Sequence, residues 1–160
     1  MDAKQEKEFE SFGCASRCLI ALANSTRARL TKETYIDRFT QKYWSSGNMC
    51  GGLTLTQIKE VGISLGLASS IKEAADFSDV RFHISSGLVR FILVYTQKKH
   101  EPDGTLSDYH HCTIVSPTVL QGQDLLYLDI VDFVSGRFLG QFQSESYILS
   151  LAPTFLLFVP

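Results

Sequence analysis

The sequence lacks any long hydrophobic run, and neither sign of charge is in strong excess. No stretch of about 18 apolar residues occurs, so we expect no membrane span. The 15 Lys and Arg residues nearly balance the 17 Asp and Glu residues, which gives a net charge of −2. A protein that binds the phosphate backbone needs a basic face, so this composition argues against nucleic acid as a partner.

Cysteine is also scarce, with four residues in a chain of 160. This content is too low for a disulfide scaffold. No Cys-x-x-Cys pair is present and the cysteine spacing resembles no common zinc module, so we expect no metal and no other cofactor. The remaining alternative is a structural zinc site made by Cys14 and Cys18 with Cys50, Cys112 or a histidine. The segment Met1–Glu10 is charged and has no apolar centre, so we expect no secretory leader there and synthesis in the cytoplasm.

The first half of the chain predicts helices. Cysteine, leucine and alanine recur at three- and four-residue spacing over Cys14–Asn24, which is typical of a buried helix. A second helix is predicted over Thr31–Tyr43, with Thr31 as its cap, and a third from Thr54 or Thr56 to Gly66. The polar residues 1–10 predict either a flexible arm or a short helix.

The second half predicts strands, separated by short connections. The predicted strands are Leu88–Tyr95, His110–Val115, Leu125–Asp132, Phe138–Phe142 and Thr154–Val159. Lys98–Asp108 is expected to be a charged loop, Val134–Arg137 a turn, and Ser144–Leu151 a short helix or strand. Helices followed by strands predict an α+β fold with antiparallel pairing, and residues 1–160 are expected to form a single domain.

A cysteine, a histidine and an aspartate are placed along the chain as thiol chemistry requires. Cys14 stands at the start of a predicted helix, where unpaired N–H groups and the helix dipole stabilise a thiolate. A nearby histidine would act as base and acid, and the candidates are His110 and His111. Because these two are consecutive on one strand, we expect them to face opposite sides, so only one can face Cys14.

A carboxylate on the far ring nitrogen would orient that histidine. Asp132 and Asp129 are the candidates, and Asp132 is favoured because it ends a predicted strand. Cys18 is the alternative nucleophile, although its helical neighbours predict an interior position. Cys50 lies in a glycine-rich segment and is expected to be structural or incidental.

Three segments together resemble the bacteriocin-processing, double-glycine peptidases of the papain-like fold. They are Gly13–Leu22 (GCASRCLIAL), His111–Val115 (HCTIV) and Ile130–Gly136 (IVDFVSG), in the order the family shows. The resemblance implies a papain-like fold, with an N-terminal helical part packed on a C-terminal antiparallel sheet. It also implies that Cys14 is the nucleophile, His111 the base and Asp132 the orienting carboxylate.

The chain departs from that family at the residue that helps to bind the oxyanion. The family has a glutamine six residues before the nucleophile, and this position is Glu8. An ionised carboxylate cannot donate a hydrogen bond, and losing one oxyanion donor lowers the rate roughly 10²–10³-fold. Gln5 is the nearest alternative donor, and it could serve only if the N-terminal arm is looped.

The sequence therefore predicts a cysteine hydrolase that acts on a peptide or carboxamide bond of a protein or peptide substrate. Because no transporter is attached, we expect a stand-alone enzyme, such as an effector or toxin-type protease exported without a cleaved leader. A glutamine deamidase or an acyl transferase would use the same residues. A catalytically inactive papain-like domain that binds proteins is the other alternative, and Glu8 favours it.

Overall fold

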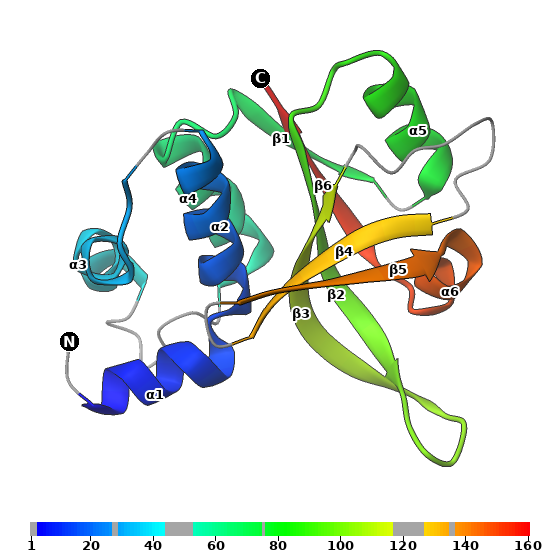
Figure 1. The fold of residues 1–160 in the computed structure, drawn as a ribbon, viewed down its shortest axis with the longest axis horizontal. Helices are drawn as coiled ribbons and strands as arrows, with labels where there is room; N and C mark the ends of the chain where they lie inside the picture. Colours follow the sequence, from blue (N-terminus) through cyan, green and yellow to red (C-terminus); the bar gives the residue numbers. More distant parts are fainter. Residues whose placement is uncertain (1–2, 27–28, 44–52, 75, 117–126, 135–136) are drawn as a thin grey trace. The chain divides into compact units, whose positions relative to one another are not determined.

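The computed structural model describes residues 3–26, 29–43, 53–74, 76–116, 127–134 and 137–160 (Figure 1). Helices come first and strands follow, which confirms the predicted α+β class. The chain divides into two compact units, Met1–Leu67 and Ala68–Pro160, and the single domain stays a prediction. Among the residues described, no helix has the length and apolar content that a membrane span requires.

The first unit consists of helices. They are α1 (Ala3–Phe12), α2 (Cys14–Ser25), α3 (Lys32–Tyr43) and α4 (Leu55–Ser64). The predictions for α2, α3 and α4 are confirmed, and of the two alternatives for residues 1–10 the structure has a helix. The buried positions of α2 recur at helical spacing because one face of the helix is in the core: Ala15, Ser16, Cys18, Leu19, Leu22 and Ala23.

Local capping explains where two of these helices begin and end. The Thr54 hydroxyl accepts a hydrogen bond from the Gln57 N–H, and the Gln57 side chain accepts one from the Thr54 N–H, so both members of a capping box start α4. At α3 the Thr31 hydroxyl accepts from the Thr34 N–H at 3.1 Å. Gly66 follows α4 with a φ of +71°, which glycine adopts without strain.

The second unit is built on a six-stranded sheet in which every neighbouring pair is antiparallel. The strand order is β1-β6-β2-β3-β4-β5. The strands are β1 (Ser70–Ala74), β2 (Phe91–His100), β3 (Leu106–Ser116), β4 (Tyr127–Val134), β5 (Arg137–Ser144) and β6 (Thr154–Val159). Two helices complete the unit, α5 (Phe77–Ser85) and α6 (Glu145–Ser150).

One face of this sheet forms a hydrophobic core with α5 and α6. Strand alternation brings Val94 opposite Phe155, and the Phe155 ring meets the edge of Phe77 of α5 with centroids 4.9 Å apart. Ile148 of α6 is 1% exposed in the same cluster. The other members are Ala74, Val80, Ile92 and Leu157.

Several predictions for the second half were wrong in extent. The strand predicted to end at Asp132 continues to Val134, because β4 and β5 pair up to Val134 and Arg137, so Asp132 is not a strand end. Lys98–Asp108 was expected to be a loop, but β2 continues to His100 and β3 begins at Leu106. These hairpin residues are mostly exposed, so they carry no apolar alternation, and Lys98 pairs in register with Asp108. The strand predicted from Leu88 begins at Phe91, and no element was predicted where β1 and α5 lie.

Candidate functional site

Cys14 is the first residue of α2, as the sequence predicted. Gly13 is the N-cap and supplies no side-chain cap, and the first turn contains no acidic residue. The side chain of Cys14 is partly exposed, whereas Cys18 is only 1% exposed. The positive end of the α2 dipole therefore lies at a partly exposed thiol, and Cys18 is interior, as expected.

Gly13 is required at the junction between α1 and α2. Its N–H donates to the Phe9 carbonyl at 2.8 Å, and its own carbonyl accepts from the Arg17 N–H at 2.8 Å. A Cβ at this position would lie 2.3 Å from the Phe9 oxygen, closer than real Cβ contacts come. The chain therefore passes from α1 into α2 through a contact that only glycine allows.

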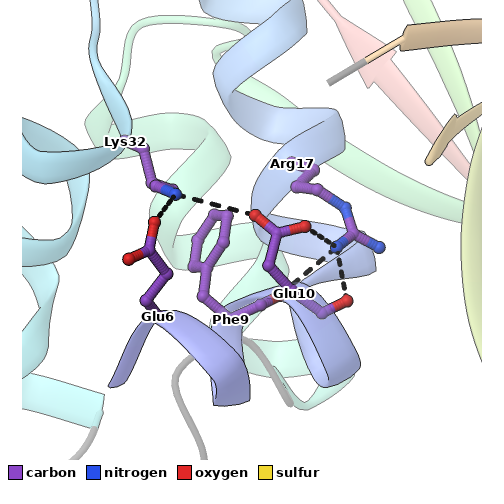
Figure 2. Close-up of polar contacts among 5 residues, drawn as sticks. All are labelled: Glu6, Phe9, Glu10, Arg17 and Lys32. Atoms are coloured by element: carbon purple, nitrogen blue, oxygen red, sulfur yellow. Dashed lines mark hydrogen bonds and ion pairs between the residues drawn. The ribbon is translucent and has the colours of Figure 1, made fainter. Parts of the chain in front are cut away.

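Charged side chains brace this junction (Figure 2). Arg17 Nη1 donates to the Glu10 carbonyl at 2.8 Å and to the Phe9 carbonyl at 3.3 Å, and it lies 3.8 Å from Glu10 Oε2. Lys32 Nζ lies 3.0 Å from Glu6 Oε1 and 3.6 Å from Glu10 Oε1, above the Phe9 ring. The hydrogen bond to Glu6 raises the pKa of Lys32 above its ordinary value, against a smaller lowering by burial.

Gln5 and Glu8 both lie within α1, not in a loop. At about 1.5 Å per residue, Gln5 is about 10 Å along the helix from its last residue. The Glu8 side chain is 20% exposed and lies 4.0 Å from Lys4 Nζ, one helical turn away. The looped arm on which the prediction for Gln5 depended is absent, so we do not include Gln5 in the proposed site.

The two candidate histidines lie at an irregularity of the β2–β3 pair. Tyr95 pairs with Cys112 and Gln97 pairs with Tyr109, so His110 and His111 both stand opposite the single residue Thr96. This is a β-bulge on β3. Regular alternation, on which the prediction of opposite faces rested, does not hold at this step.

Thr96 has a φ of +52°, in the left-handed region that β-branched residues rarely enter. Its hydroxyl donates to the Thr154 hydroxyl at 3.2 Å. Bulges and strained residues are both frequent at functional sites, where they redirect a side chain. Here the two features coincide, opposite the histidines that the sequence singled out.

Among the residues described, the β3–β4 pairing runs from Ser116 opposite Asp129 to Ile114 opposite Val131. Position 132 is the next one along β4 after Val131. Continued by one residue, the same register would set position 132 opposite Thr113, two residues from His111. The pairing of His111 with Asp132 stays a prediction.

Thr113 is 4% exposed, and its hydroxyl has no hydrogen-bond partner among the residues described. A buried hydroxyl without a partner is unusual, because its desolvation is not compensated. Sequence reasoning did not identify Thr113 or Thr96 as part of the site, because threonine is common in ordinary strands.

Cys14 belongs to the first unit, and His110, His111, Asp129 and Asp132 belong to the second. Within the part of the chain that the structure describes, no group of three or more His, Cys, Asp or Glu side chains could hold a metal ion. Cys14, Cys18 and Cys112 are thiols, and Cys50 lies outside the described residues. The chain matches no known protein family, no curated protein and no solved structure.

Proposed function

We propose that this protein is a papain-like cysteine hydrolase that cleaves a peptide or carboxamide bond through Cys14, His111 and Asp132. One observation carries the proposal: His110 and His111 form a β-bulge opposite Thr96, whose φ lies in the left-handed region. The placement of Cys14 at the first turn of α2 supports the same assignment.

In the proposed reaction, His111 takes the proton of the Cys14 thiol, and the thiolate attacks the carbonyl carbon of the substrate. The backbone N–H of Cys14 donates to the developing oxyanion. Protonated His111 returns the proton to the leaving amine, which departs and leaves a thioester on Cys14. Water, deprotonated by His111, then hydrolyses the thioester and releases the acid. Asp132 holds the imidazole in the required tautomer.

His111 is preferred to His110 because its segment is the one that resembles the histidine strand of the double-glycine peptidases. The β3–β4 register, continued one residue past Ile114 and Val131, would set position 132 opposite Thr113, two residues from His111. A carboxylate on the far ring nitrogen is what distinguishes an oriented catalytic imidazole from an incidental one.

The proposed substrate is a protein or peptide. The leaving group distinguishes a protease from a deamidase at the same site. Cleavage of a main-chain bond releases a new N-terminal amine, as in an effector or toxin-type protease. Attack on a glutamine side chain releases ammonia, as in a deamidase, and an amine in place of water gives acyl transfer. The products separate these activities: a shortened substrate, a mass increase of about 1 Da, or an adduct.

A catalytically inactive binding module is the second candidate, and Glu8 favours it. Glu8 occupies the position at which the resembling family carries its oxyanion glutamine, and its carboxylate lies beside Lys4. An ionised carboxylate cannot donate to an oxyanion. A module of this kind would bind its partner without the ion-paired thiolate of an enzyme.

The pH dependence of Cys14 alkylation separates the two. Below its pKa of about 8.5, an ordinary thiol reacts about tenfold more slowly with each unit of pH. We expect iodoacetamide to alkylate Cys14 at pH 6 at a rate within a few-fold of that at pH 8, measured by mass spectrometry of the Cys14 peptide. A tenfold loss per pH unit would support the binding module.

A short bifunctional alkylating reagent then tests which imidazole is the neighbour. The proposed pair requires the thiol and the imidazole to lie within roughly 4 Å, so a bridge of one to three carbon atoms should join Cys14 to His111. His111→Gln should abolish this cross-link, and His100→Gln, at an exposed position of the hairpin, should not. A cross-link to His110 would transfer the role of base, and no cross-link to either would refute the Cys–His pair.

A further inference from the structure

We propose that Arg17 is a positioning residue that holds the α1–α2 junction and favours the thiolate of Cys14. This inference rests on the proposed role of Cys14 as nucleophile. It comes from the charged contacts at the end of α1, which the reaction itself does not use (Figure 2).

Arg17 turns back from the first turn of α2 onto the last turn of α1. Its Nη1 lies 2.8 Å from the Glu10 carbonyl and 3.3 Å from the Phe9 carbonyl. The last four carbonyls of a helix have no partner within it and carry the negative end of the helix dipole. Arg17 therefore places a cation at the negative end of α1, on the Glu10 carbonyl and on a Phe9 carbonyl that also accepts from the Gly13 N–H.

These carbonyls lie just before Cys14 in the chain. The Phe9 oxygen also accepts from Gly13, the residue that precedes the thiol. Without Arg17, the negative end of α1 would oppose a thiolate at the adjoining start of α2. The Arg17 side chain is 16% exposed, so solvent screens its charge less than it would screen that of a surface arginine.

The other charged groups of the junction set the sign of the expected effects. Glu10 Oε2 lies 3.8 Å from Arg17 Nη1 and partly cancels its charge. Lys32 of α3 lies 3.6 Å from Glu10 and 3.0 Å from Glu6, and so offsets both carboxylates. Removing the Arg17 cation should disfavour the thiolate, and neutralising Glu10 should favour it.

The test is the pH–rate profile of Cys14 alkylation by iodoacetamide in the full chain, compared between variants. Arg17→Met should raise the midpoint by about half a pH unit, which is about threefold slower alkylation well below the midpoint. Glu10→Gln should lower the midpoint by about 0.3 pH unit. A purely structural role would not give opposite signs.

Arg38→Met is the matched control. Arg38 Nη2 donates to the Ser64 carbonyl at 2.8 Å, so this variant also removes one cation from one helix end in the same unit, away from the α1–α2 junction. Its profile should match the wild type. A wild-type midpoint in Arg17→Met, or an equal shift in Arg38→Met, would overturn the inference.

The alkylation experiment still tests the role of Arg17 if the Arg17→Met variant does not fold or if Cys14 is an ordinary thiol. If Arg17→Met does not fold by circular dichroism, Glu10→Gln alone decides, because an unchanged or raised midpoint contradicts the role of Arg17. If wild-type Cys14 behaves as an ordinary thiol, the proposed hydrolase fails. The difference between wild type and Arg17→Met still reports whether Arg17 stabilises the thiolate.

Discussion

Gly13→Ala is the substitution whose cost the structure defines most directly. The added Cβ would lie 2.3 Å from the Phe9 carbonyl oxygen and 3.3 Å from the Phe9 ring. The first atom belongs to the backbone, so it cannot move aside as the end of a flexible side chain can. The separation must increase to at least 3.0 Å, which displaces the end of α1 relative to the start of α2.

That displacement strains the hydrogen bond from the Gly13 N–H to the same carbonyl, now 2.8 Å long. Overpacking of this kind costs about 1–3 kcal/mol. A smaller gain of about 0.4–1 kcal/mol comes from the reduced freedom of alanine in the unfolded chain. We therefore expect a net loss of about 1–2 kcal/mol, or about 2–8 °C in Tm for a chain of this length.

Urea unfolding followed by circular dichroism measures the loss, and the Cys14 alkylation rate reports the junction itself. Gly87→Asn is the control, because Gly87 has a φ of +65° and nothing within 4 Å of the added atom, and asparagine tolerates this conformation. We expect its stability to change by less than about 1 kcal/mol. Wild-type stability and wild-type Cys14 reactivity in Gly13→Ala would refute the close contact.

Four further outcomes follow from the described contacts. Thr54→Ala should lower the free energy of unfolding by about 1 kcal/mol in urea, because it removes the capping box of α4. Phe155→Ala should cost about 3–5 kcal/mol, since Phe155 is 0% exposed in the core; a loss below 1 kcal/mol would contradict that placement. Thr96→Gly should change stability by no more than about 1 kcal/mol, because relief of about 1–2 kcal/mol of left-handed strain offsets the flexibility of glycine and one lost hydrogen bond. Lys32→Met should be less stable than wild type at neutral pH, and the difference should shrink above about pH 10.4. The raised pKa of Lys32 means that its contribution is complete below that value and disappears as the lysine deprotonates, and a difference independent of pH would exclude the ion pair with Glu6.

The helices of the first unit could be predicted because their signals are local. In α2 the apolar spacing that begins at Cys14 coincides with the buried face, and Gly13 directly precedes it. At α4 the cap is a threonine followed three residues later by glutamine, a pattern visible without any tertiary contact. These elements need no information from distant residues.

The hairpin between β2 and β3 could not be predicted by the same means. Its outer part, Lys98–His100 paired with Leu106–Asp108, is mostly exposed, so no apolar alternation marks it as strand. Strand β1 escapes prediction for a related reason: it is a five-residue edge strand, and only Ala74 of it is buried. Pairing with β6, 80 or more residues away in sequence, is what makes it a strand.

Part of the candidate site could be predicted from local sequence signals, and part of it depends on strand pairing. Thiol chemistry was predicted from the residue types and their order along the chain, because a helix start and two strands are each recognisable locally. The strand end predicted at Asp132 was wrong, since β4 continues to Val134. The bulge is not recognisable, because it depends on how β3 aligns with β2: a one-residue mismatch places His110 and His111 opposite Thr96 and Thr96 in the left-handed region. Because the two histidines share one bulge, neither alternation nor the described pairing of β3 with β4 separates them. The choice of His111 therefore rests on the order of the three segments along the chain. A cross-link from Cys14 to His110 would transfer the role of base to that residue.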